Sequence, residues 1–117
     1  LQEAKDEQER EEVRRRLKRL REEEQQMLAD IDELKQRMDK AEKLKARLLA
    51  GRGYHNFLFS DLVFLLESLG FAMRINGSHR WFTRPDISDA INIQPRKGQA
   101  KPYQLRQIRK LIKTHNL

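Results

Sequence analysis

The chain has 117 residues, 37% of them charged, and its formal net charge at pH 7 is +7. This length is short for two globular cores, and the absence of cysteine excludes disulfides and thiolate metal sites. No apolar run is long enough to span a membrane, and no apolar segment opens the chain as a secretory signal would. We therefore expect a cytoplasmic protein without a membrane segment.

The excess positive charge lies entirely in the second part of the chain. Residues 1–50 carry 14 Lys/Arg and 14 Asp/Glu, whereas residues 51–117 carry 11 Lys/Arg and 4 Asp/Glu. A small basic domain is typical of a protein that binds a polyanion, most commonly RNA or DNA. A basic surface that only keeps the protein soluble is the alternative.

Residues 1–50 predict one long helix, because they contain neither Gly nor Pro and are rich in helix-forming residues. A 4-3 spacing runs without a break from Val13 to Leu48, which is the signature of a coiled coil. The a positions are Leu17, Glu24, Ile31, Met38 and Lys45, and the d positions are Val13, Leu20, Met27, Leu34, Ala41 and Leu48. Glu24 and Lys45 interrupt the stripe, so a solvated single helix is the alternative. We expect self-association or a partner helix through residues 13–48, in an orientation that the pattern leaves open.

A hinge over residues 51–55 is predicted by Gly51-Arg52-Gly53, since glycine accepts the left-handed conformation that ends a helix. Residues 56–117 then form a compact domain. Its first helix is predicted over residues 61–69, capped by Ser60 and stopped by Gly70.

Three strands are predicted next. Apolar and polar residues alternate over residues 71–76, and the Asn76-Gly77 turn that follows is the strongest short signal for a hairpin. The second strand covers residues 79–84, Pro85 begins a turn, and the third strand covers residues 90–94.

A basic loop over residues 95–101 leads to a final helix, for which Pro102 suits the first turn. Its apolar stripe consists of Leu105, Ile108, Leu111 and Ile112. The predicted fold class is therefore α+β, with a long N-terminal helix followed by a small α-β-β-β-α domain. Both short helices can cover one face of the sheet and leave the other face open, which is the layout of a double-stranded-RNA-binding-domain-like fold.

The second strand has two possible orientations. Strand alternation places two sets of side chains on opposite faces: His79, Trp81 and Thr83 on one, and Arg80, Phe82 and Arg84 on the other. If Phe82 is in the core, Trp81 lies on the open face and can stack a nucleic-acid base. The two arginines beside Phe82 favour the reverse arrangement, because charged residues are rarely buried. We therefore predict Trp81 in the core.

Residues 56–117 resemble the HicA-type toxins of bacterial toxin–antitoxin systems. The resemblance is carried by Leu65-Leu66-Glu67-Ser68-Leu69-Gly70-Phe71, Gly77-Ser78-His79, Pro95 with Lys97-Gly98, and Lys101-Pro102-Tyr103-Gln104-Leu105-Arg106-Gln107-Ile108-Arg109. Residues 1–50 lie outside it. The resemblance implies an mRNA interferase, an endoribonuclease that cleaves mRNA without a metal, with a histidine of the Gly-Ser-His region as catalytic residue. It also implies a HicB-like antitoxin that covers the site.

Cleavage of RNA without a metal needs a base, an acid and cations that stabilise the charged phosphorane. His79 is the candidate acid or base, and Arg80, Lys97 and Lys101 are candidate phosphate ligands. Arg106 and Arg109 of the last helix can bind the RNA backbone. The four carboxylates of residues 51–117 are too scattered for a two-metal site, so we expect neither a metal nor another cofactor.

Many HicA-type toxins have a further histidine after the third strand, and residues 94–98 of this chain have none. Two alternatives to the enzyme therefore stay open. One is a non-catalytic RNA-binding module made bivalent by the coiled coil. The other is a protein-interaction adaptor whose basic surface meets an acidic partner.

Overall fold

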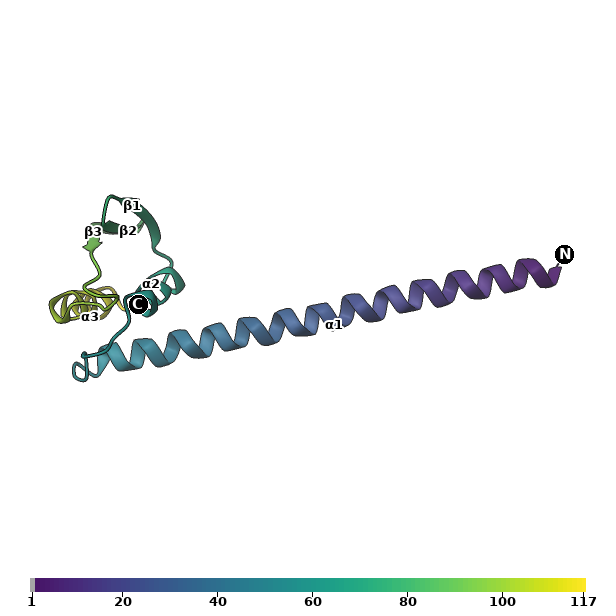
Figure 1. Cartoon of the computed structure of the whole chain (residues 1–117), viewed down its shortest axis with the longest axis horizontal. Helices are drawn as coiled ribbons and strands as arrows, with labels where there is room; N and C mark the ends of the chain where they lie inside the picture. Colours follow the sequence, from purple (N-terminus) through teal and green to yellow (C-terminus); the bar gives the residue numbers. More distant parts are fainter. Residues whose placement is uncertain (1) are drawn as a thin grey trace. The chain divides into compact units, whose positions relative to one another are not determined.

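The computed structural model describes residues 2–117 and confirms the predicted α+β fold class. The elements are α1 (Gln2–Leu49), α2 (Phe59–Ser68), β1 (Ala72–Asn76), β2 (His79–Arg84), β3 (Ile87–Ile93) and α3 (Pro102–His115) (Figure 1). A long helix is thus followed by a helix, three antiparallel strands and a final helix. None of these helices is both long and apolar enough to cross a membrane.

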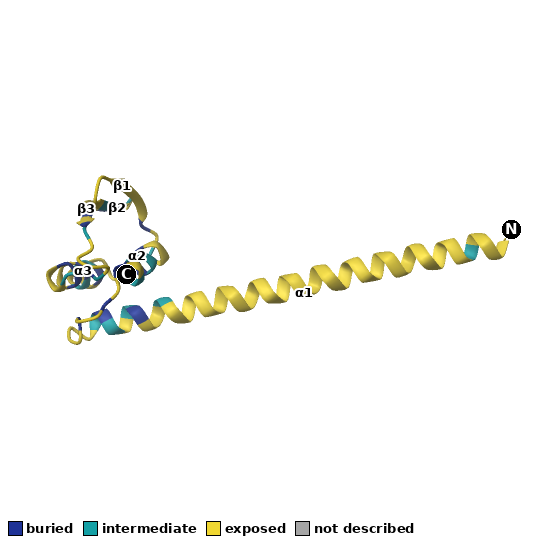
Figure 2. Ribbon diagram, in the orientation of Figure 1, coloured by how far each residue is buried: buried dark blue, intermediate teal, exposed yellow. Residues whose placement is uncertain are grey.

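The chain divides into two compact units, one ending at Arg37 and the other comprising Met38–Leu117. The first unit is a single stretch of α1 whose side chains are almost all exposed (Figure 2). Ion pairs within the helix include Arg37 with Glu33 at 2.9 Å and Arg14 with Glu11 at 3.1 Å. Each such pair stabilises a helix by only about 0.2–0.5 kcal/mol.

The end of α1 belongs to the second unit, because Leu44 and Leu48 are buried in its core (Figure 2). This unit therefore begins earlier than the domain expected at residue 56. The carbonyl of Leu48 accepts a hydrogen bond from the Tyr54 hydroxyl at 2.8 Å. Lys40 forms an ion pair with Asp61 of α2 at 3.4 Å. The last turns of α1 thus pack against the small domain instead of extending a free coiled-coil stripe.

The start of α2 differs from the prediction. Its N-cap is Leu58, which is extended and makes no side-chain cap, so the prediction that Ser60 caps this helix is wrong. The loop over residues 95–101 sets the start instead: Leu58 pairs with Gln99, and the amide of Phe59 donates to the Gly98 carbonyl at 3.0 Å. A partner distant in sequence has therefore replaced the local cap.

The C-terminal stop of α2 is the predicted one. Gly70 has φ +92°, and the amide of Phe71 donates to the Leu66 carbonyl at 3.1 Å. This is a Schellman-type ending, in which a left-handed glycine lets the chain leave the helix. The chain turns there directly into β1.

The sheet has the order β1-β2-β3, with β2 in the centre. The predicted hairpin is confirmed, but Asn76 pairs with His79, so the two turn residues are Gly77 and Ser78, and of these only Gly77 has a positive φ (+62°). β3 begins at Ile87, three residues earlier than predicted, because Pro85 and Asp86 form a tight turn and Arg84 already pairs with Ile87. Ile87 is buried, although the neighbouring Ser88 and Asp89 favour strands poorly.

The core lies between one face of the sheet and the helices. Phe82 is fully buried and faces Met73 of β1 and Ile91 of β3, whereas Trp81 is only half-buried. The prediction that Trp81 is in the core is therefore wrong. Arg84 and Arg80 share the face of Phe82 without being deeply buried, because they lie at the two ends of the strand. Arg84 reaches the Leu69 carbonyl at 2.9 Å and the Asp86 carboxylate at 2.8 Å.

Candidate active site

The face of the sheet opposite Phe82 is free of helices and carries mostly polar side chains; we call it the open face. The residues that define it are Arg74 and Asn76 of β1, His79 and Trp81 of β2, Asn92 of β3, and Gln94 directly after β3. All of them are exposed or half-buried. They share this face because side chains alternate along each strand and the pairing register aligns them across the sheet.

The side chain of His79 is held by β3. Its Nδ1 lies 3.0 Å from the side-chain oxygen Oδ1 of Asn92. The adjacent Ser78 is held as well, because Gln94 Nε2 donates to its hydroxyl at 2.7 Å. When the Asn92 oxygen accepts a hydrogen bond from Nδ1–H, the other nitrogen of the neutral ring, Nε2, carries the lone pair. The hairpin thus presents an oriented imidazole with one nitrogen free to take a proton.

A cation and an indole lie beside this imidazole. Trp81 is the neighbour of His79 on the same face, and its register partners are Arg74 on β1 and Asn92 on β3. A half-buried indole on an open sheet face can stack one nucleic-acid base, and an arginine on the neighbouring strand can contact the phosphate of the same nucleotide. The open face therefore combines stacking, a positive charge and a proton acceptor.

Two members of the open face, Arg74 and Asn92, are absent from the site residues expected from the sequence. Alternation along residues 71–76 already separates Arg74 from the apolar Met73 and Ile75. The prediction that Trp81 is in the core, however, places the face that Arg74 shares with Trp81 inside the domain, so the sequence does not point to Arg74 as a site residue. Asn92 could be found only from the register of β2 against β3.

Arg80 lies on the other face of β2. It lines an apolar groove with an accessible volume of about 540 Å³, together with Phe59, Met73, Ile75 and Pro95. Met73 and Ile75 remain 38% and 56% exposed there, since β1 is an edge strand. Arg80 and His79 are adjacent in sequence, yet their side chains lie on opposite faces of the sheet.

Lys97 and Lys101 lie on the loop that follows Gln94. Lys97 is exposed and has φ +53°, in a tight turn where Arg96 and Gln99 exchange backbone hydrogen bonds of 2.9 and 3.0 Å. Lys101 precedes the first turn of α3, and its Nζ lies 5.9 Å from the centre of the Tyr103 ring. The loop begins directly after Gln94, the residue whose side chain donates a hydrogen bond to Ser78 in the hairpin turn. Its lysines therefore follow this contact closely in the sequence.

The two arginines of α3 differ in their surroundings. Arg106 is exposed. Arg109 donates from Nε to the Leu49 carbonyl at 3.1 Å, and its guanidinium carbon would lie 3.0 Å from a Cβ added at Gly51. Arg109 therefore caps the end of α1 and is engaged in holding the second unit together.

Acidic and metal-binding side chains do not gather at this site. Across residues 2–117, no three side chains of the types His, Cys, Asp and Glu come together in a way that could hold a metal ion. The other two histidines of the chain lie elsewhere, His55 in the loop after α1 and His115 in the last turn of α3.

The comparisons with known proteins identify the segment that contains this site. No curated protein and no solved structure matches the chain. The family model described as HicA toxin of bacterial toxin–antitoxin matches residues 59–114. This range contains α2, the three strands and almost all of α3, and leaves out α1. The domain formed by residues 59–114 is therefore a HicA toxin domain, as the sequence resemblance predicted.

Proposed function

We propose that this toxin domain binds single-stranded RNA on its open face and cleaves it without a metal, with His79 as acid or base. The observation that carries the proposal is the contact of 3.0 Å between Nδ1 of His79 and Oδ1 of Asn92. This contact lies on the same face of the sheet as Trp81 and Arg74. The family match supports it, because the domain is that of a toxin from toxin–antitoxin systems.

The chemistry begins at the ribose 2′-hydroxyl. Nε2 of His79 takes the proton of this hydroxyl as its oxygen attacks the adjacent phosphorus. The bond from phosphorus to the 5′-oxygen then breaks, and that oxygen gains a proton. The products are a 2′,3′-cyclic phosphate and a free 5′-hydroxyl, so no metal, oxidant or second substrate is consumed.

A single imidazole serves only one of the two proton transfers. No second histidine lies on the open face described above, so water supplies or removes the other proton. General acid–base catalysis by one positioned side chain contributes about 10²–10⁴-fold to a rate. We therefore expect slower turnover than in a nuclease that uses two imidazoles.

Binding and charge stabilisation fall to the neighbouring residues. Trp81 stacks a base, a contact worth about 1–3 kcal/mol in proteins that bind single strands. Arg74 meets the phosphate on one side, and Lys97 and Lys101 extend the positive surface along the loop after β3. Arg80, on the opposite face, and Arg109, which caps α1, are left out of this proposed set.

We also propose a HicB-like antitoxin as the protein partner, because the family match is to toxins of such pairs. An antitoxin that covers the open face would keep RNA from His79. Oxidative footprinting of the complex tests this. We expect the bound antitoxin to protect Trp81 from oxidation, and equal oxidation of Trp81 with and without the antitoxin would contradict the proposal.

The nuclease activity can be tested with the full chain and a labelled single-stranded RNA in the presence of EDTA. His79→Ala should lower the cleavage rate at least about 100-fold. His55→Ala is the matched control, since it removes an exposed histidine from a loop outside the site, and it should cleave at the rate of the unchanged protein.

Asn92→Ala tests the positioning role. It should lower the rate about tenfold while RNA affinity stays the same, because it frees the imidazole without removing it. Equal binding by all variants with no cleavage by any of them would refute the enzyme and leave the non-catalytic RNA-binding module. Loss of both binding and cleavage in Trp81→Ala alone would place the RNA on the open face.

A further inference from the structure

Helix α1 carries an apolar row without a partner over residues 13–38. Seven side chains of the a and d positions on α1, which we call the seam, are 48% to 64% exposed. The seam consists of Val13, Leu17, Leu20, Met27, Ile31, Leu34 and Met38. It ends at Met38, because Leu44 and Leu48 are taken up by the core of the second unit. An exposed apolar row on an otherwise charged helix marks an interaction surface.

We propose that the seam pairs with the seam of a second copy of this chain, in a parallel two-stranded coiled coil. Ile31 at an a position with Leu20 and Leu34 at d positions suits a parallel dimer. The orientation follows from the charged residues that flank the seam. This inference is independent of the proposed nuclease activity.

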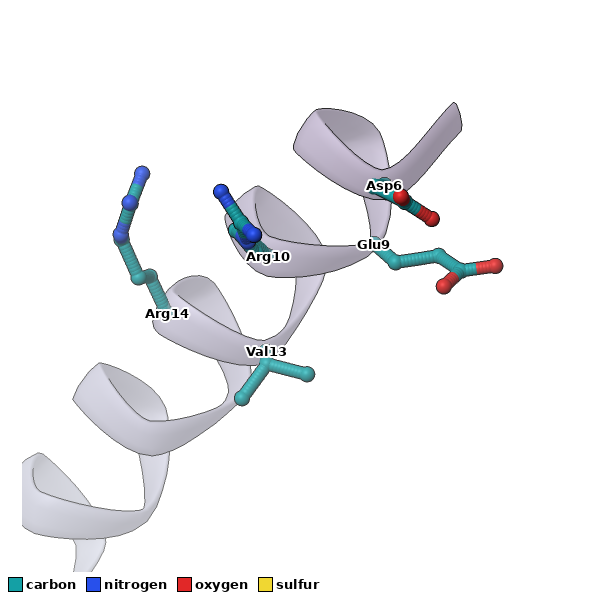
Figure 3. A pocket seen from close by; sticks show the side chains of 5 residues that line it. All are labelled: Asp6, Glu9, Arg10, Val13 and Arg14. Atoms are coloured by element: carbon teal, nitrogen blue, oxygen red, sulfur yellow. The ribbon is translucent and has the colours of Figure 1, made fainter. Parts of the chain in front are cut away.

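In a parallel pair, each g residue of one copy faces the e residue five positions later in the other copy. Figure 3 shows the start of such a row, with Val13 between Glu9, a g residue, and Arg14, an e residue. Three such pairs have opposite charges and one has like charges. The favourable pairs are Glu9 with Arg14, Asp30 with Lys35, and Arg37 with Glu42, and the unfavourable pair is Arg16 with Arg21.

An antiparallel pair that uses the whole seam has only one alignment, in which Val13 faces Met38 and Glu24 faces Met27. Its flanking pairs would then be Arg14 with Lys35, Arg16 with Arg37, and Glu23 with Asp30. All three have like charges, and like charges in these positions oppose pairing. Other antiparallel alignments leave part of the seam unpaired. The charge pattern therefore favours the parallel arrangement.

Glu24 is the exception within the seam, since the parallel arrangement places it opposite its own copy. A polar residue at one a position weakens a coiled coil while it restricts register and oligomeric state. The dimer is thus expected to be moderately stable. Both toxin domains follow the same end of the coil in sequence, so a single RNA or antitoxin can meet two of them and gain avidity.

Sedimentation equilibrium of the full chain tests the pairing. The expected mass is twice the 14.0 kDa of one chain. Leu20→Lys, which places two lysines together in the seam, should weaken the dimer at least about 100-fold. Gln25→Lys, at an outward b position of the same helix, is the matched control and should leave it unchanged. Glu24→Leu should tighten the dimer about tenfold. Trp81 fluorescence confirms in each variant that the toxin domain is folded.

Single cysteines test the orientation, because the chain has none of its own. Val13→Cys should form a disulfide-linked dimer under mild oxidation, since the two copies of this residue face each other only in the parallel arrangement. A mixture of Val13→Cys and Met38→Cys should not form a disulfide between position 13 of one copy and position 38 of the other. A monomer at 14.0 kDa at high protein concentration, a trimer, or cross-linking only in the mixture would overturn the proposal.

Discussion

Leu48 offers a direct test of whether the end of α1 is part of the toxin domain. Its side chain is 0% exposed and lies in the same core as Phe57 and Leu62. Leu48→Ala removes buried carbons and leaves a cavity among them. The main-chain carbonyl of Leu48 still accepts the hydrogen bond from Tyr54, so only packing is lost.

The expected loss can be worked from this burial. Replacing a fully buried leucine by alanine lowers the free energy of unfolding by about 2–5 kcal/mol, depending on how far the cavity closes. The cavity of Leu48 is bounded by a helix, so full closure is not expected. A loss of about 3 kcal/mol with a urea m-value of about 1.5 kcal/mol/M lowers the unfolding midpoint by about 2 M.

Urea unfolding followed by the fluorescence of Trp81 measures this shift, because Trp81 is the one tryptophan of the chain and lies on the central strand. Leu28→Ala is the matched control: it is the same substitution on the same helix, at a residue that is 58% exposed. Its free energy of unfolding should change by less than about 0.5 kcal/mol. Equal midpoints for Leu48→Ala and Leu28→Ala would refute the assignment of α1 to the core.

Three further predictions concern the sheet, the end of α2 and the open face. Phe82→Ala should lower the free energy of unfolding by about 3–5 kcal/mol in urea titrations followed by circular dichroism, whereas Trp81→Ala on the opposite face should lower it by less than half as much; equal losses would contradict the assigned faces. Gly70→Ala should lose about 1–2 kcal/mol in the same assay through strain alone, since an added Cβ has no neighbour closer than 3.8 Å. Arg74→Ala should reduce the slope of log affinity for single-stranded RNA against log salt concentration by about 0.7, the value for one phosphate contact; an unchanged slope would remove Arg74 from the site.

Much of the fold could be predicted because several of its turns and helix ends are set by residues close together in the sequence. The hairpin turn requires a left-handed backbone conformation at Gly77, which glycine accepts readily, and the start of β2 follows from it. The start of α2 could not be predicted in this way. It depends on a backbone bond to Gly98, which is far away in the sequence. The early start of β3 likewise depends on Arg84 as a pairing partner.

The residues of the proposed site could be recognised only in part from the sequence, for a related reason. His79 stands out in its turn, but the residue that holds it, Asn92, is 13 positions away and becomes its neighbour only through the strand register. Alternation shows that Trp81 and Phe82 point to opposite sides of the sheet, and it does not show which side is buried. The arginines beside Phe82 suggested an exposed face, yet both escape burial at the ends of the strand.

The core has a consequence for how this chain folds as it leaves the ribosome. It is completed by the two helices that lie farthest apart in the chain, since Leu48 of α1 packs in one cluster with Leu105 and Ile108 of α3. The core therefore cannot close until α3 has left the exit tunnel. Nascent chains that stop before Pro102 would lack this wall and could not hold the sheet with His79 in place.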